Sequence, residues 1–434
     1  MIRRASAVLA ILFFINFLNY TDRFVLSAVL HLLKTDLHLT PEDEGWLATA
    51  FTLGYMFSSP IIANFADRWT RPRIVALCCL VWSLATLACG LAIGFKTLLF
   101  ARVLIGVGEA GFLTVGPPLI ADAFSKESRG KALSVFYTGV PIGCACGFVL
   151  GGLLPGLHLS ETLAIGWRGT FFTVAIPGIA IAAVAWVLVD PPRGAQDTEL
   201  GIHAPLPKQG TIWEQLALFR NRTFGFVTLA LTGIAFATVP LLHWLPQFFG
   251  NVKHIAPSKA NVMIGLTLIL PGILGTLLGG WAGDRISKRG IPGGYLMVAA
   301  VGLVGGLVCL WVAILSPRPW IFLPALFFGV MFFMSCTPTL NTTIANISAP
   351  NARAMAYATV IFCMHAFGDT VSPLLFGKLI ANHGLERAFL FMPVALLVSA
   401  AACIAGIFTI RGDLARTEER VTQLVRKTHV PRTR

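Results

Sequence analysis

The chain has 434 residues, of which 56% are hydrophobic and 12% are charged, and its mean hydropathy is +0.76. About a quarter of the residues in a soluble domain carry a charge, so this composition excludes an ordinary soluble protein and indicates a membrane protein. The formal net charge of +13 does not indicate a nucleic-acid-binding protein, because the basic residues gather at the ends of apolar stretches.

Twelve stretches of the chain are apolar and long enough to cross a bilayer, whose hydrocarbon core of roughly 30 Å takes about 20 helical residues. Each is expected to be a helix, because lipid offers no hydrogen-bond partner to exposed backbone groups. The predicted fold is therefore an all-α membrane protein. The stretches are 6–33, 44–66, 74–95, 97–121, 131–155, 167–189, 222–249, 259–283, 293–315, 319–345, 353–381 and 385–410.

The first stretch contains polar residues in its middle, within the sequence NFLNYTDRFVLSAVL. The residues that share one helical face are Asn16, Asn19, Tyr20, Arg23 and Ser27. Asp22 flanks this polar stripe. An ionisable group deep in a membrane helix is costly unless it is paired or hydrated, so we favour a functional role over an Asp22–Arg23 pair that only fixes packing. No small-residue cleavage site follows, so we expect a retained helix and not a signal peptide.

Similar charged loops follow the second and the eighth stretch, with the sequences ANFADRWTRPR and GWAGDRISKRG. Asp67-Arg68 and Asp284-Arg285 are separated by half the length of the chain, which predicts two six-helix halves. Together with Arg71, these residues are expected to form cytoplasmic gating contacts that exist in one conformation and break in another.

The fourth stretch contains the sequence RVLIGVGEAGF. Arg102, Gly106 and Glu109 lie on one helical face, with Arg102 and Glu109 two turns apart. Burial favours the protonated form of a carboxyl group, whereas a nearby arginine favours the ionised form. A carboxyl group under both influences can gain and lose a proton near neutral pH, so Glu109 is a candidate proton carrier. A structural ion pair between helices is the alternative.

The longest polar stretch, 190–222, is predicted to be a cytoplasmic linker between the halves. Its Thr211–Phe219 segment has the spacing of a capping box and an apolar side, which is compatible with a short interfacial helix or with an irregular connector. The predicted organisation is a first half over 1–189, the linker, a second half over 223–411 and a basic cytoplasmic tail over 412–434.

The eleventh stretch contains HAFGDTVSP, in which His365, Asp369 and Ser372 share one helical face. A lone membrane histidine is often a packing residue, but with Asp369 it is also a candidate for substrate binding.

Most of the 33 Lys and Arg residues lie on the side that holds both termini and the linker. The excess of basic residues marks the cytoplasmic side of a membrane protein. We therefore expect both termini in the cytoplasm and the protein in the inner, or plasma, membrane.

The two halves with their repeated G-x-x-x-D-R-x-x-R type loops resemble the major facilitator superfamily. A closer resemblance, to the Spinster branch, rests on six segments in matching order, namely NYTDRF, RVLIGVGEAGF, PPLIADAFSKESRGKALSVFY, PIGCACGFVLGG, DPPRG and HAFGDTVSP. This resemblance implies a bacterial homologue that transports lysophospholipids or sphingoid phosphates and is linked to protons. The membrane charges of that branch correspond to Asp22, Arg23, Arg102, Glu109, His365 and Asp369.

The function expected from these observations is proton-coupled secondary transport of an amphiphilic anion by alternating access. Asp22 and Glu109 are the predicted proton-coupling residues. The predicted substrate-binding residues are Arg102, Arg23, Asn19, Tyr20, His365 and Asp369. The expected partners are a lipid-like or organic anion, protons and membrane lipids, with no nucleic acid, and the protein is expected to be a monomer.

A transporter of small organic anions or drugs, and a membrane sensor that does not translocate its ligand, are the alternatives. The sequence contains no nucleophile elbow, phosphate-binding loop or metal-ligand spacing. We therefore expect no enzyme activity, no cofactor and no metal.

Overall fold

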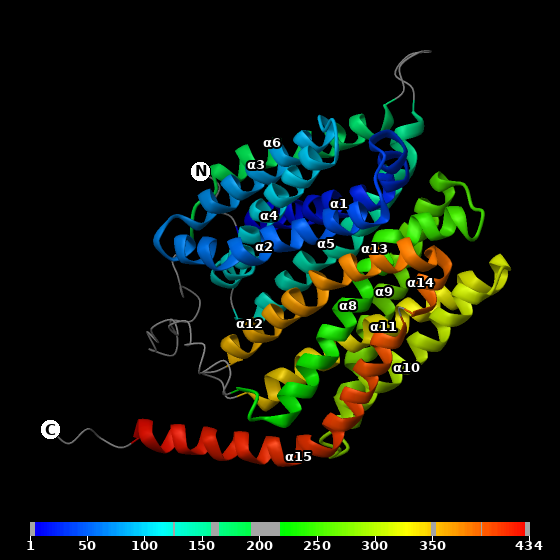
Figure 1. Cartoon of the computed structure of the whole chain (residues 1–434). Helices are drawn as coiled ribbons and strands as arrows, with labels where there is room; N and C mark the ends of the chain where they lie inside the picture. Colours follow the sequence, from blue (N-terminus) through cyan, green and yellow to red (C-terminus); the bar gives the residue numbers. More distant parts are fainter. Residues whose placement is uncertain are drawn as a thin grey trace. The chain divides into compact units, whose positions relative to one another are not determined.

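The computed structural model describes residues 5–124, 126–157, 165–191, 218–348, 353–391 and 393–429. These residues are almost entirely helical (Figure 1). The helices of the first half are α1 (Ala5–Leu37), α2 (Pro41–Arg68), α3 (Arg71–Gly90), α4 (Phe95–Ala123), α5 (Lys126–Leu153) and α6 (Gly166–Trp186). Those of the second half are α8 (Arg222–Asn251), α9 (Pro257–Ser287), α10 (Gly294–Leu315), α11 (Pro319–Ile347), α12 (Arg353–Cys363), α13 (Val371–His383), α14 (Leu385–Phe391) and α15 (Pro393–His429), with a π-helical segment, η3 (Met364–Asp369), between α12 and α13.

Eleven helical spans among the described residues are long and apolar enough to cross a membrane. Helix α2 occupies the position of the remaining predicted span. The prediction of an all-α, multi-pass membrane protein is therefore confirmed. The proposed interfacial helix lies mostly in 192–217, outside the described residues.

Short connections set the antiparallel order of the first helices. The backbone turns at His38, which has a φ of 53°, and α2 begins after Thr40. The Thr40 hydroxyl accepts a hydrogen bond from Asp43 N at 3.2 Å, and the Asp43 carboxylate accepts one from Thr40 N at 2.9 Å. This reciprocal cap satisfies the first backbone donors of α2 and leaves Glu44 on its first turn.

Two predicted spans differ from the structure in detail. The span 353–381 is interrupted by the π-helical segment, because Pro373 cannot donate to the carbonyl of Asp369 and its ring disfavours regular helix at that turn. The last span continues as helix to His429. Residues 413–427 are rich in Leu, Arg and Glu, which favour helix, and in Figure 1 the end of α15 turns away from the direction of its first part.

The chain groups into two compact units. Unit 1 takes its residues from Met1–His203, Pro240–Ile269 and Thr370–Ala388, and unit 2 from Ala204–Val239, Leu270–Asp369 and Phe389–Arg434. Unit 1 thus combines the first six helices with parts of α8, α9 and α14 and the whole of α13. The division of the sequence at the 190–222 linker stays a prediction.

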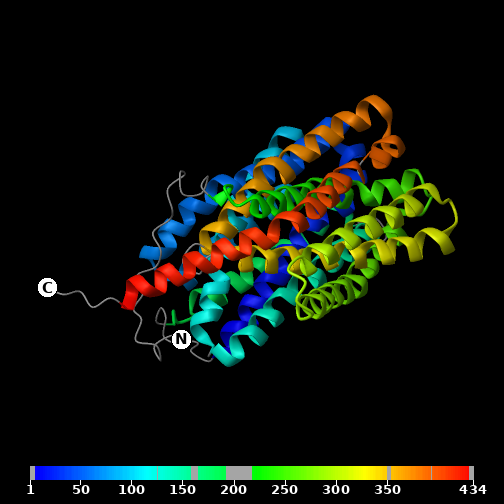
Figure 2. The same cartoon turned by 90° about the horizontal axis from the view of Figure 1, so that it is seen from below.

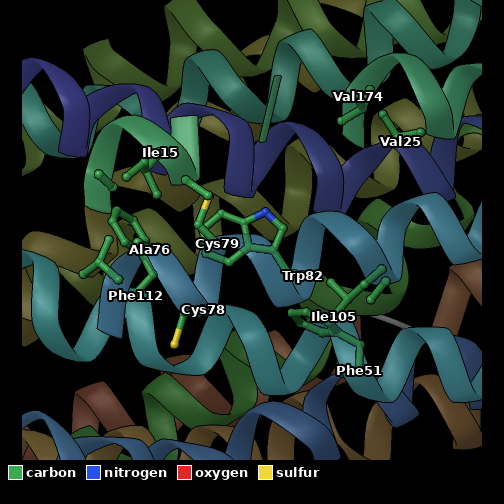
Figure 3. Packing of buried hydrophobic residues seen from close by; sticks show 14 of the residues in the cluster. Ile15, Val25, Phe51, Ala76, Cys78, Cys79, Trp82, Ile105, Phe112 and Val174 are labelled. Carbon is green, nitrogen blue, oxygen red and sulfur yellow. The ribbon is translucent and has the colours of Figure 1, made fainter. Parts of the chain in front are cut away.

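The core of unit 1 lies around α3 and α4 (Figure 3). Trp82 of α3 packs edge-on against Phe112 of α4, with ring centroids 6.0 Å apart. Both side chains are fully buried. Cys79 Sγ donates to the carbonyl of Gly178 on α6 at 3.3 Å, so this cysteine is a packing residue that joins two helices.

In unit 2, α10 packs against α11 and α15, and α10 and α11 run side by side in both views (Figures 1 and 2). Gly302 permits this contact, because a Cβ at that position would meet Ser335 and Cys336 of α11.

Candidate functional site

Arg23 of α1 and Glu109 of α4 form an ion pair within unit 1. Arg23 Nη2 lies 2.6 Å from Glu109 Oε2, and Arg23 Nε donates to the same oxygen at 3.1 Å. The Glu109 side chain is fully buried, whereas that of Arg23 is 23% exposed. Glu109 Oε1 has no hydrogen-bond partner among the described residues. One oxygen of this carboxylate therefore carries the whole contact.

Aromatic rings surround the Arg23 guanidinium. Its Cζ lies 4.9 Å from the ring centroid of Tyr20, 4.7 Å from that of Phe51 and 5.8 Å from that of Tyr55. Such faces attract a cation without neutralising it. Their attraction for the guanidinium does not depend on the charge of Glu109.

Arg102 of α4 is buried without an ion-pair partner among the described residues. Its guanidinium lies over the ring of Phe51, which also contacts Arg23, with Cζ 4.9 Å from the ring centroid. Arg102 Nε donates to the carbonyl of Leu47 at 3.4 Å, and Nη1 makes no hydrogen bond to any described residue. A buried arginine with an unused donor is suited to bind an anion.

Asp22 is not paired with its neighbour Arg23. Its Oδ2 accepts a short hydrogen bond from the hydroxyl of Thr86 on α3, and its Oδ1 has no partner among the described residues. The residue is 3% exposed. The alternative of a self-neutralising Asp22–Arg23 pair is therefore wrong, because the two side chains contact different helices. We call Asp22, Arg23, Arg102 and Glu109 the charge cluster.

The remaining residues of the α1 stripe have different surroundings. Asn19 is buried near Glu109. Neither polar atom of its side-chain amide forms a hydrogen bond with a described residue. Asn16 donates to the carbonyl of Phe136 on α5 at 2.8 Å. Ser27 lies 3.2 Å from His243 Nδ1. Asn16 therefore joins two helices, whereas Asn19 belongs with the charge cluster.

Glycines allow the helices that carry the cluster to approach closely. A Cβ on Gly106 of α4 would collide with the carbonyl oxygen of Phe51 on α2, and one on Gly143 of α5 would collide with that of Phe17 on α1. Small residues at helix crossings have this effect in membrane proteins generally. The close approach at Gly106 brings Phe51 of α2 to α4, where its ring contacts both arginines.

His365 and Asp369 pair with each other in the π-helical segment of unit 2. His365 Nδ1 lies 2.8 Å from Asp369 Oδ2. A π-helical turn often marks a functional position in a helix. The pair remains a substrate-binding candidate separate from the charge cluster.

The predicted gating residues are engaged to different extents. Arg71 is buried and bridges Asp122 and Asp190, with Nη1 2.5 Å from Asp122 Oδ2 and Nη2 2.8 Å from Asp190 Oδ1. It therefore joins the start of α3 to the end of α4 and the segment after α6. The side chains of Asp67 and Arg68 lie outside the described residues.

In the second copy of the loop, Asp284 accepts a hydrogen bond from the hydroxyl of Tyr295 at 2.7 Å. Arg285 is exposed and lies over the ring of Trp281 at 5.5 Å. The two loops therefore differ in their contacts although their sequences are similar.

A second buried carboxylate, which the sequence analysis did not single out, lies at the α1–α2 end of unit 1. Glu44 accepts hydrogen bonds from Trp244 Nε1 at 2.6 Å and from Gln247 Nε2 at 3.1 Å, and it lies 3.3 Å from Lys34 Nζ. These contacts connect α8 to α1 and α2. The residue resembled an ordinary acidic residue of a first helical turn, so no local signal revealed it.

His243 was also missed. It is buried. Its Nδ1 contacts Ser27, whereas its Nε2 has no hydrogen-bond partner among the described residues. Its signal was available, because a histidine inside an apolar stretch is a functional candidate in any membrane helix.

Comparison with known proteins agrees with this architecture. The family model of the Major Facilitator Superfamily matches residues 12–368. Human "Protein spinster homolog 1" is 30% identical over 399 residues, which cover 86% of this chain and 72% of the human protein. The "Protein spinster" of Drosophila melanogaster is 30% identical over 381 residues, covering 85% of this chain and 61% of the fly protein.

A solved structure is also similar to this chain. It is described as a bacterial homolog to the human lysosomal transporter Spinster, in an inward-facing and unoccupied conformation. The TM-score is 0.83 at 25% identity, and the match covers 94% of this chain and 98% of the other. The extent of the family match, the two curated relatives and the shared fold lead to one conclusion. The chain belongs to the major facilitator superfamily and, within it, to the Spinster branch of membrane transporters.

Proposed function

We propose that this Spinster-type transporter moves an amphiphilic anion across the cell membrane, coupled to protons, by alternating access. The observation that carries the proposal is the charge cluster, in which Asp22, Glu109 and Arg102 are buried and Arg23 is partly buried, while its members form only one ion pair among the described residues. Structural charges in a membrane are normally paired in full. Charges that are not fully paired are suited to bind a proton or a substrate.

The proposed coupling is a competition for Arg23. An ionised Glu109 occupies the Arg23 guanidinium through its Oε2 atom. A proton on Glu109 removes the charge that holds this contact, and Arg23, still surrounded by aromatic rings, becomes available to an anion. Proton and anion binding then favour each other, which is the linkage that coupled transport needs.

Asp22 would relay or share this proton. Its Oδ1 atom has no hydrogen-bond partner among the described residues, and its Oδ2 accepts from Thr86. Electrostatic interactions link Asp22 to Glu109, Arg102 and Arg23. A change of charge on either carboxylate therefore changes the proton affinity of the other.

Arg102 would anchor the anionic head of the substrate, and Arg23, Asn19 and Tyr20 would also contribute to binding. His365 and Asp369 of unit 2 are further proposed substrate-binding residues. The buried Nη1 donor of Arg102 supports the anchoring role. The resemblance to the Spinster branch supports a lysophospholipid or a sphingoid phosphate as the amphiphile.

The proposed topology places both termini and the 190–222 linker in the cytoplasm. The α1–α2 end then faces outward, and the Arg71 contacts with Asp122 and Asp190 lie at the cytoplasmic side. Arg71, Asp67, Arg68, Asp284 and Arg285 would contribute to cytoplasmic gating.

The test is a flux assay in proteoliposomes with and without a pH gradient. Glu109→Gln keeps the shape of the side chain but cannot release a proton, so pH-driven uptake of a lysophospholipid should be lost while some substrate exchange remains. Asp22→Asn should behave similarly. Asp36→Asn is the matched control, because this carboxylate lies on the same helix in an exposed ion pair with Arg168.

Normal pH dependence in both cluster variants would remove Glu109 and Asp22 as proton carriers. Equal uptake of small carboxylates would favour the organic-anion alternative. Ligand binding without flux in wild type would favour a sensor.

A further inference from the structure

An apolar groove lies between α9 and α10 in unit 2, apart from the residues proposed for transport. It has a volume of about 290 Å³, and its lining residues include Leu278, Ala282 and Ile286 of α9, Met297 and Val301 of α10 and Phe332 of α11. Leu278 is 48% exposed, Met297 37% and Val301 65%. The groove therefore opens at the surface of the unit, and α11 forms its floor.

In the first half, side chains occupy the space around Gly111 of α4. There, α2 and α3 both pack on α4. A Cβ on Gly111 of α4 would meet the side chains of Cys78 from α3 and Ile62 from α2. In unit 2, by contrast, Gly275 and Gly279 of α9 and Gly302 of α10 line the groove. The two halves therefore differ at these glycines, because side chains occupy the space at Gly111 whereas the glycines of unit 2 line a groove.

Basic residues lie at the end of the groove where its two walls are joined. The connection from α9 to α10 spans only Lys288–Gly293, and Arg285, Lys288 and Arg289 are all exposed. Within the described part of the chain, none of the three forms an ion pair with an acidic residue. Arg285 instead lies over Trp281, which is 59% exposed.

The corresponding position of the first-half loop is engaged within the chain. Arg71 is buried and already bonded to Asp122 and Asp190. Lys288 occupies the position equivalent to Arg71 when the two loops are aligned on their Asp-Arg pairs. The second-half loop therefore offers positive charge to a partner from outside the chain.

We propose that this groove is a binding site for an anionic phospholipid of the adjacent leaflet. One acyl chain would lie between α9 and α10, and the phosphate would contact Arg285, Lys288 and Arg289. Tryptophan and arginine at the membrane–water interface suit a headgroup at this level, and clustered basic residues attract anionic lipid. The site involves none of the charge-cluster residues; Arg285 is also a proposed gating residue, so the test measures lipid retention and not flux.

The experiment measures lipid retention by the purified full-length protein. Delipidated protein in detergent is incubated with phosphatidylglycerol or with phosphatidylcholine, and bound lipid is counted by native mass spectrometry. Wild type should retain one phosphatidylglycerol in preference to phosphatidylcholine. The double variant Arg285→Gln with Lys288→Gln should weaken phosphatidylglycerol retention roughly thirtyfold, because each basic residue near a membrane surface contributes a roughly fivefold attraction.

Val301→Trp should fill the groove and lower retention of both lipids roughly tenfold by displacing the chain. Two controls match these changes. Val308→Trp adds the same bulk on α10 at a residue that is 52% exposed and does not line the groove. Arg318→Gln removes another arginine that lies over a tryptophan ring, that of Trp320.

Normal retention in either the charge variant or Val301→Trp would overturn the proposal. Equal losses in the controls would also overturn it, because they would indicate a general lipid annulus. The readout involves a two-chain lipid and no flux, so failure here leaves the proposed transport untouched, and failure of transport leaves this site untouched.

Discussion

The Arg23–Glu109 ion pair predicts that neutralising both partners is less harmful than neutralising either one. Removing one partner of a buried ion pair leaves an uncompensated charge and costs about 3–5 kcal/mol. The Arg23 side chain is 23% exposed, so partial hydration favours the lower end of that range. We expect Glu109→Gln and Arg23→Gln each to lower the free energy of unfolding by about 3 kcal/mol.

The double variant leaves two neutral amides facing each other. We expect it to recover about 2 kcal/mol relative to the sum of the single changes, as coupled partners in a double-mutant cycle do. Asp22→Asn breaks no ion pair and keeps an acceptor for Thr86, so it should cost only about 1 kcal/mol. Arg168→Gln with Asp36→Asn tests an exposed pair in the same bundle and should show little coupling.

The assay is equilibrium unfolding of the purified variants in mixed micelles, with helix content as the readout. Additive losses in the double variant would refute the pairing of Arg23 with Glu109. A loss for Asp22→Asn as large as that for Glu109→Gln would refute the statement that Asp22 is held by a hydrogen bond alone.

Three further predictions concern gating, substrate and topology. Glu44→Ala removes the acceptor of Trp244 and Gln247, which connects α8 to α2. It should raise the rate at which an impermeant maleimide labels a cysteine introduced at Ser27, and Glu44→Gln should raise that rate less. Unchanged labelling would contradict the expectation that these contacts hold α8 against α2. The affinity for the substrate should rise with its acyl length, because each buried CH₂ contributes about 0.8 kcal/mol. Arg102→Ala should weaken binding at every acyl length, and more than Arg102→Lys does. Binding measurements that show no dependence on acyl length would exclude an amphiphile site. Cysteines introduced at positions 6, 209 and 433 should resist labelling from outside intact cells, and efficient labelling would reverse the proposed orientation.

The helices were predictable because the membrane constrains them strongly. A chain that crosses lipid must satisfy its backbone internally, so long apolar stretches give helices with bounds close to those observed. The polar stripe of α1 was predictable for a similar reason, since charges in lipid must face other protein. The π-helical interruption at Met364–Asp369 was not predicted, because the apolar pattern continues through that segment.

The partners of the polar residues were not predictable. Asn16, Asn19 and Arg23 share one face, yet Asn16 bonds to α5 and Arg23 bonds to α4. Spacing along one helix gives a direction for a side chain, but the neighbour in that direction depends on how the helices cross. That crossing is set by contacts such as the approach of Gly106 to Phe51.

The sequence by itself determined that this is a multi-pass helical membrane protein of the Spinster type, because composition, periodicity and ordered motifs are local properties of the chain. Only the tertiary structure decided that Glu109 pairs with Arg23 while Arg102 keeps an unused donor, and that Glu44 joins α2 to α8. Residues such as Glu44 and Trp244 are far apart in the chain, and no local pattern encodes a contact that depends on the packing of whole helices.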